Sequence, residues 1–187
     1  MSELTEGTYC LTADTIFIQI ASYRDPELLN TIRDCDKNAN MPNNLVFCIC
    51  WQKDDTESLE EYTNDIRMKI IPIHYKDSKG VCWARNKIQQ HYNNEKYTLQ
   101  LDSHHRFVKG WDTILINMYK LLKEKGYQKP LITTYLPSYD PENDPNGRVQ
   151  TPWKMVFDKF IENNIVIFLP EYITNPSELI EPLPAKF

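Results

Sequence analysis

Residues 16–35 read IFIQIASYRDPELLNTIRDC, and they join a buried strand to an amphipathic helix. The run from Ile16 to Tyr23 is almost continuously apolar, which is typical of a strand that is covered on both faces. Asp25-Pro26 follows with an N-cap acceptor and a proline at the first helical position. Apolar residues then recur at helical spacing on one face, at Leu28, Ile32, Cys35 and Ala39. The sequence therefore predicts a strand that turns directly into a helix.

The same alternation of strands and helices continues to residue 136. Apolar runs predict further strands over residues 45–51 (LVFCICW), 69–75 (KIIPIHY), 97–101 (YTLQL) and 131–136 (LITTYL). Helical spacing predicts a short helix through Leu59, Tyr62 and Ile66, and longer helices over residues 81–92 and 111–125. Pro72 has no amide proton, so its strand is expected at a sheet edge or in an irregular pairing. This order predicts the α/β class, with a mostly parallel sheet flanked by helices.

The sequence after Pro137 is irregular. Two apolar runs, Trp153–Phe160 and Ile165–Leu169, flank Asn163-Asn164 and predict a β-hairpin. A chain of 187 residues and 22.1 kDa fits a single domain. We expect residues 1–15 to be an N-terminal extension, residues 16–139 to be the α/β core, and residues 140–187 to be a proline-rich loop, the hairpin and a loosely held tail.

Composition and charge argue against several classes of protein. The chain has 26 acidic and 21 basic side chains, a formal charge of −5, and no basic run that would attract nucleic acid. No apolar stretch reaches the roughly 18 residues of a membrane span, and the N-terminus lacks a secretion signal. The odd number of cysteines predicts buried thiols in a reducing compartment, at Cys10, Cys35, Cys48, Cys50 and Cys82. We therefore expect a soluble, cytoplasmic protein.

The residues that follow the predicted strands are the candidates for chemistry. The sequence contains no Gly-x-Gly-x-x-Gly, Walker, Gly-x-Ser-x-Gly or His-Glu-x-x-His motif, which removes the common dinucleotide, NTPase, esterase and zincin interpretations. In open α/β sheets, ligands bind outside the carboxyl ends of the strands. Four segments occupy such positions, namely residues 22–25 (SYRD), 51–52 (WQ), 80–86 (GVCWARN) and 102–106 (DSHHR).

Asp102 and His104 stand two residues apart where a strand ends, so both side chains can face one cation. This spacing imitates a D-x-D site. A hard cation held by one carboxylate and one imidazole keeps positions open for phosphate oxygens. The alternative is that Asp102 caps the next turn beside surface histidines. His105 is expected to be an exposed residue or a neighbour that supports a ligand, and not a ligand itself.

Arg85 lies near a predicted helix start, where backbone N–H groups and the helix dipole favour a phosphate. Its guanidinium would add a fork of hydrogen-bond donors to such a site. The alternative is a solvated or salt-bridged arginine. Trp51 is a candidate platform for a nucleotide base or, alternatively, a core residue, and Arg24 either contacts a nucleotide or pairs with a neighbouring carboxylate.

Four ordered segments together resemble a known family. They are IFIQIASYRDPELLNTIRDC (16–35), GVCWARN (80–86), LQLDSHHRFVKGWD (99–112) and LITTYLPSY (131–139). The chain resembles the cytoplasmic N-acetylglucosaminyltransferases that cap hydroxyproline on a ubiquitin-ligase subunit. The resemblance implies a GT-A-like (Rossmann-like) fold, UDP-N-acetylglucosamine (UDP-GlcNAc) as donor, a protein or glycan hydroxyl as acceptor, and Mn²⁺ or Mg²⁺ as cofactor.

The resemblance also implies roles for individual residues. Asp102 and His104 match the family's metal segment, and Arg85 with Asn86 matches its Ala-Arg-Asn element. Ser22, Tyr23 and Arg24 match the end of the family's first strand, which is expected to contact the nucleotide. With Trp51 and Asp102, these residues complete the predicted nucleotide site.

The resemblance ends at Tyr139. Beyond that point the family continues with an Ala-Gly-Phe strand and a Gly-Glu-Glu segment that supply acceptor contacts and a catalytic carboxylate, and this sequence has neither. The expectation is a donor half with most of the acceptor half missing, and no catalytic residue is assigned. Two hypotheses follow. One is a metal-dependent glycosyltransferase, and the other is a truncated or inactive domain that binds a sugar nucleotide or a protein partner without turnover.

Overall fold

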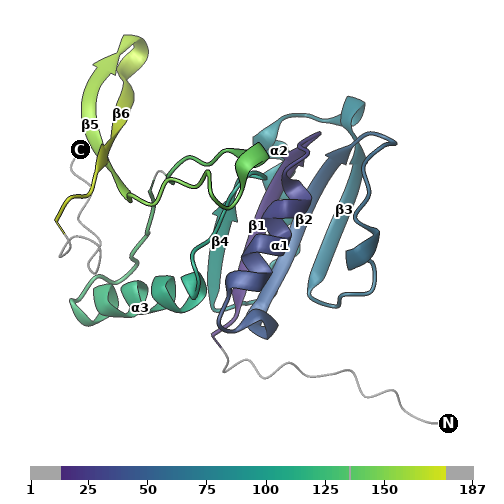
Figure 1. Cartoon of the computed structure of the whole chain (residues 1–187), viewed down its shortest axis with the longest axis horizontal. Helices are drawn as coiled ribbons and strands as arrows, with labels where there is room; N and C mark the ends of the chain where they lie inside the picture. Colours follow the sequence, from purple (N-terminus) through teal and green to yellow (C-terminus); the bar gives the residue numbers. More distant parts are fainter. Residues whose placement is uncertain (1–13, 135, 176–187) are drawn as a thin grey trace. The chain divides into compact units, whose positions relative to one another are not determined.

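The computed structural model describes residues 14–134 and 136–175, and the chain divides into two units at Asp112/Thr113. The first unit contains four strands, β1 (Ile16–Tyr23), β2 (Leu45–Lys53), β3 (Met68–His74) and β4 (Tyr97–Leu101). They form one sheet in the order β3-β2-β1-β4, and every neighbouring pair is parallel (Figure 1). The predicted α/β class with a mostly parallel sheet is confirmed.

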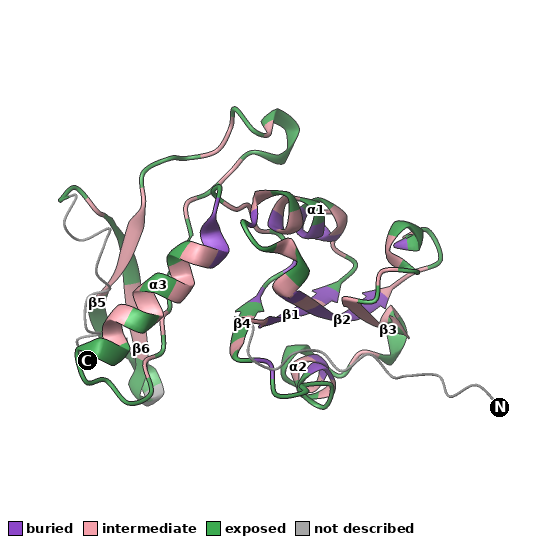
Figure 2. Cartoon of the chain, turned by 90° about the horizontal axis from the view of Figure 1, so that it is seen from below, coloured by how far each residue is buried: buried purple, intermediate pink, exposed green. Residues whose placement is uncertain are grey.

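Helices cover both faces of this sheet. α1 (Leu28–Asn38) lies on one face and α2 (Val81–Gln89) lies on the other (Figure 2). This arrangement explains why β1 and β2 are apolar at nearly every position, since water is excluded from both sides. On one side of the sheet a buried cluster joins the strands to α2, comprising Phe17, Cys48, Cys50, Ala84 and Ile88. Burial of side chains as large as Phe17 and Ile88 contributes about 1.5–3 kcal/mol each, so this core holds α2 against the strands.

The prediction from Pro72 is confirmed, because β3 forms an edge of the sheet. Two other local predictions are wrong. α1 begins at Leu28 and not at Pro26, because the Asp25 carboxylate accepts a hydrogen bond from the Glu27 amide (2.9 Å) and closes a separate turn ahead of the helix. The expected short helix is a single 3₁₀ turn, η2 (Glu60–Tyr62), because Ile66 is 81% exposed and adds nothing to an apolar face.

The cysteines behave as expected with one exception. Cys35, Cys48 and Cys50 are buried free thiols, and burial raises the pKa of Cys48 to about 12. Cys82 is exposed, which corrects the expectation that it is buried. Ala84 and Ile88 form the inward face of α2, and Cys82 lies outside that face in the first turn of the helix. Cys10 lies outside the described residues.

α3 (Trp111–Glu124) starts at the end of the first unit, and Gly126, with a φ of +93°, follows it. The second unit then contains η4 (Pro141–Asn143), β5 (Trp153–Ile161), η5 (Glu162–Asn164) and β6 (Ile165–Tyr172). β5 and β6 pair antiparallel, so the predicted hairpin is confirmed.

The strand predicted over residues 131–136 is wrong. None of its described residues, which exclude position 135, forms a strand, and Leu131 is 87% exposed. An apolar run becomes a strand only where a neighbouring strand edge satisfies its backbone groups. The described residues of this segment make no such pairing.

The remaining elements of the first unit are the single turns η1 (Pro42–Asn44) and η3 (Tyr75–Asp77). Among the residues that the structure describes, no helix combines the length and the apolar character needed to cross a membrane.

Candidate functional site

The carboxyl ends of β1, β2 and β4 meet at one edge of the sheet. Strand register places Ser22 beside Trp51 and Ile20 beside Leu101, so the chain leaves β4 at Asp102 close to the end of β1. A cavity of about 280 Å³ lies at this edge. It is lined by residues from the strand ends and from the loops that follow them, namely Ala21, Tyr23, Asp25, Gln52, Ser78, Gly80, Val81, Asp102, Ser103 and His104.

The structure brings four of the predicted site residues together. Tyr23, Asp102 and His104 line the cavity. Arg85 lies beside it, since its Nη2 is 3.3 Å from the Oδ1 atom of Asp102. The predicted cation ligands and the predicted phosphate ligand are therefore neighbours, although Arg85 and Asp102 are separated by the whole of β4 in the sequence.

The other predicted residues do not line the cavity. Trp51 is only 7% exposed and its indole Nε1 donates to Glu57 (2.9 Å), so burial removes this ring as a platform for a base. Ser22 is fully buried at the end of β1. The Arg24 guanidinium lies 4.6 Å from the ring centre of Tyr75 and 3.4 Å from Asp54. Asn86 accepts a hydrogen bond from Gln90 one turn along the chain (3.2 Å).

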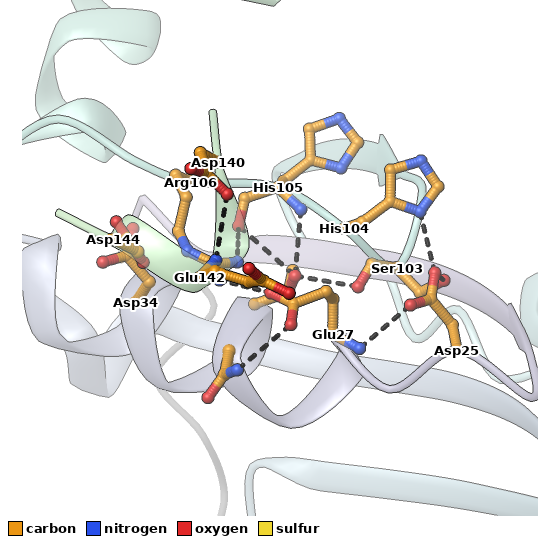
Figure 3. A network of polar contacts seen from close by, with 12 residues as sticks. Asp25, Glu27, Asp34, Ser103, His104, His105, Arg106, Asp140, Glu142 and Asp144 are labelled. Carbon is orange, nitrogen blue, oxygen red and sulfur yellow. Dashed lines mark hydrogen bonds and ion pairs between the residues drawn. The ribbon is translucent and has the colours of Figure 1, made fainter. Parts of the chain in front are cut away.

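Asp25, which belongs to the candidate segment 22–25 and was expected to cap the following helix, also lines the cavity. Its Oδ2 atom accepts a hydrogen bond from the Ser103 hydroxyl (2.6 Å) and lies 2.7 Å from His104 Nδ1 (Figure 3). Burial alone would raise the pKa of Asp25, but hydrogen bonds from Ser103, His104 and the Glu27 amide outweigh it and lower the pKa. In the sequence, Asp25 could be recognised only as a carboxylate at the end of a buried strand. Its contact with His104 joins residues 79 positions apart, so local patterns do not reveal it.

α1 fixes the loop that follows β4. Thr31 is fully buried, and its hydroxyl donates to the Ser103 carbonyl (2.8 Å) and accepts from the His105 amide (2.9 Å). Asp34 accepts from the Phe107 amide (2.6 Å), and the Arg106 guanidinium pairs with Glu27 (Figure 3). The loop residues His105 and Phe107 are thus bound to α1, and Arg106 is bound to Glu27, the residue just before it. These contacts fix the backbone of the loop that carries Asp102 and His104.

His105 is half-buried, and it does not line the cavity. Burial lowers its pKa, partly offset by a contact between its Nδ1 and the Asp102 carbonyl (2.8 Å). The neutral ring therefore donates its Nδ1 proton to that carbonyl.

The beginning of α2 adds positive potential to the same cavity. Gly80 precedes the helix with a φ of +91°, which glycine adopts without strain, and it offers no capping side chain. Gly80 and Val81 both line the cavity, so the first turn of α2 lies at its wall. Unpaired N–H groups in a first helical turn favour an anion.

The side chains at the cavity suit a divalent cation that is also bound by phosphate oxygens. Among the described residues, no group of three or more His, Cys, Asp or Glu side chains is arranged to hold a metal ion alone. Asp102, whose side chain is 58% exposed, and His104 both face the cavity. Mg²⁺ and similar hard ions are commonly held by one or two protein ligands, with substrate phosphates and water completing the shell. The residues present fit that mode.

Comparison with protein families identifies the chain. The model of the family described as Glycosyltransferase (GlcNAc) matches residues 15–67 and 57–187. The match continues past Tyr139, where the resemblance drawn from the sequence ended. No curated protein matches the chain. Because the family model covers nearly all of the sequence, the chain belongs to the GlcNAc glycosyltransferase family.

Proposed function

We propose that this chain binds UDP-GlcNAc together with a divalent cation and transfers the sugar to a hydroxyl group. The observation that carries the proposal is the convergence of Arg85, Asp102, His104 and the start of α2 at one cavity. A nucleotide diphosphate needs both positive donors and a bridging cation, and this cavity offers ligands for each. The family supports GlcNAc as the sugar.

Arg85 is the proposed phosphate ligand. Its side chain is 30% exposed and projects from α2, the helix whose first turn lines the cavity. A guanidinium presents several N–H donors in a plane, which suits the oxygens of a diphosphate. The ion pair with Asp102 holds it at the cavity in the absence of ligand.

Asp102 and His104 are the proposed cation ligands. A bound divalent cation would neutralise the charge that develops on UDP as it leaves. In the transfer, the acceptor oxygen forms a bond to the anomeric carbon, the bond from that carbon to the UDP oxygen breaks, and the hydroxyl proton is released to a base. We assign no side chain of this chain to that base.

One observation favours binding without turnover as a second candidate function. Two of the described residues that line the cavity are carboxylates, and both already have partners, Asp25 with Ser103 and His104, and Asp102 with Arg85. Neither is an obvious base or nucleophile. A UDP-GlcNAc-binding domain without transferase activity would use the same residues for the diphosphate and the cation.

The test separates the two candidates. We expect Mn²⁺-dependent stabilisation of the fold by UDP in a thermal-shift titration, because a ligand that binds only the folded state raises its stability. We also expect Mn²⁺-dependent release of UDP from UDP-GlcNAc, measured with a coupled assay. Stabilisation without release would favour the binding function. A melting temperature that UDP leaves unchanged, with and without Mn²⁺, would contradict both.

Replacing Arg85 with lysine separates phosphate recognition from charge. Lysine keeps the positive charge but loses the planar fork, so we expect UDP affinity at saturating Mn²⁺ to fall. Loss of one charge-assisted hydrogen bond is worth about 1.5–3 kcal/mol, or about ten- to hundredfold in the dissociation constant. Calorimetric titration with UDP measures the effect.

Arg33→Lys is the matched control. Arg33 lies on α1, forms an exposed ion pair with Glu61 and does not line the cavity. It should bind UDP like the wild type. If Arg85→Lys also bound UDP normally but melted at a lower temperature, Arg85 would be a structural residue.

A further inference from the structure

The contact between His104 and Asp25 determines which ring nitrogen of His104 carries a proton. Nδ1 of His104 lies 2.7 Å from Oδ2 of Asp25. An aspartate carboxyl group is ordinarily ionised at neutral pH, and an ionised carboxylate only accepts hydrogen bonds, as Asp25 does from the Glu27 amide and the Ser103 hydroxyl. Nδ1 must therefore be the donor. In the neutral ring this leaves the lone pair on Nε2.

Asp25 is itself held in place from two sides. Its Oδ1 atom accepts from the Glu27 amide (2.9 Å), and its Oδ2 atom accepts from the hydroxyl of Ser103, a residue that is only 4% exposed (2.6 Å). The Asp25 side chain is 17% exposed, whereas that of His104 is 60% exposed. A fixed, mostly buried carboxylate thus orients an imidazole that lines the cavity.

We propose that Asp25 is the positioning residue for His104, selecting the tautomer and the ring orientation that offer Nε2 to a divalent cation in the cavity. The inference rests on the proposed function, since the cation belongs to it. Histidines that bind metals almost always donate their other ring N–H to a carboxylate, a carbonyl or water. Loss of that partner costs about 10- to 100-fold in metal affinity.

Asp25→Asn tests this with almost no change in shape. The asparagine oxygen must face the Glu27 amide, which is a donor, so the NH₂ group is left to face Ser103 and His104. Nδ1 of His104 then has to accept, and the proton moves to Nε2, where it blocks the lone pair. The substitution is therefore expected to invert the tautomer and to weaken cation binding.

Two measurements on the full chain read these effects independently. Long-range ¹H–¹⁵N correlation spectra, recorded where the imidazole is neutral, report the tautomer of His104 without any metal. We expect the proton on Nδ1 in the wild type and on Nε2 in Asp25→Asn. Calorimetric titration of UDP at a series of Mn²⁺ concentrations reports the cation. We expect the Mn²⁺ concentration for half-maximal UDP binding to rise by about 10- to 100-fold in the variant.

Asp65→Asn is the matched control. Asp65 also accepts hydrogen bonds from an arginine side chain and from a backbone amide, both of Arg67, but it precedes β3 at the opposite end of the strands. It should alter neither readout, whatever it does to the melting temperature.

Each remaining outcome counts against the inference in a different way. A proton on Nε2 in the wild type would overturn it without any variant, and so would Mn²⁺ dependence that is equal in the wild type and Asp25→Asn. Failure of the wild type to bind UDP with Mn²⁺ would overturn the proposed function and this inference with it.

Discussion

Replacing Asp102 with alanine is expected to remove the Mn²⁺ dependence of UDP binding while leaving the protein folded. The partners of bound metal ligands already account for about 10- to 100-fold in metal affinity, so loss of a ligand itself should cost at least about a hundredfold. Folding should be little affected, because the Asp102 side chain is 58% exposed and its contact with His105 uses the backbone carbonyl, which alanine retains. UDP titrations with and without Mn²⁺, together with a melting curve, measure both effects.

Asp77→Ala is the matched control for charge. Asp77 is an exposed carboxylate next to Ser78, which lines the cavity, but Asp77 does not line it. If the loss of Mn²⁺-dependent UDP binding came only from weaker long-range attraction between carboxylates and Mn²⁺, both variants would lose UDP affinity to a similar extent. Equal Mn²⁺ dependence in the wild type and Asp102→Ala would remove Asp102 from the cation site.

The second large effect is expected from Thr31→Val, a substitution of nearly equal volume. The Thr31 hydroxyl is fully buried and satisfies both the Ser103 carbonyl and the His105 amide. Valine would leave both backbone groups without this partner. An unsatisfied buried polar group costs about 1–3 kcal/mol, so the loss of the partner of two such groups should lower the free energy of unfolding by about 2–6 kcal/mol. Denaturant-induced unfolding measures this loss.

Thr31→Ser is the matched control because it keeps the hydroxyl and removes only the methyl group. It should lose much less stability than Thr31→Val. In addition, Thr31→Val should weaken Mn²⁺-dependent UDP binding under conditions where it is still folded, because the loop with Asp102 and His104 has lost its support from α1. Equal stability of the two variants would show that the hydroxyl contributes little.

Much of the fold could be predicted from local patterns. The apolar run of β1, the helical spacing of α1 and the edge position implied by Pro72 each depend on short stretches of sequence. The hairpin around Asn163-Asn164 is of the same kind. These features could be predicted because the spacing of buried residues along a strand or helix is visible within a short stretch of sequence.

Some of the failures depend on contacts between distant parts of the chain. Residues 131–136 have the composition of a strand, but composition does not show whether an unpaired sheet edge is available. The candidate site follows the same rule. Asp102 and His104 could be selected from their spacing, whereas the contact of Asp25 with His104 exists only because β4 pairs with β1.

The position of β4 also bears on how the protein acquires its shape. β1 pairs Ile16 with Leu45 on one side and with Tyr97 on the other, so the second pairing closes a much longer loop of chain. Closing long loops costs more chain entropy and slows folding, which favours early formation of the β1–α1–β2 unit and late addition of β4. The nascent chain would then acquire its cavity at the last step, after most of its hydrophobic core has formed.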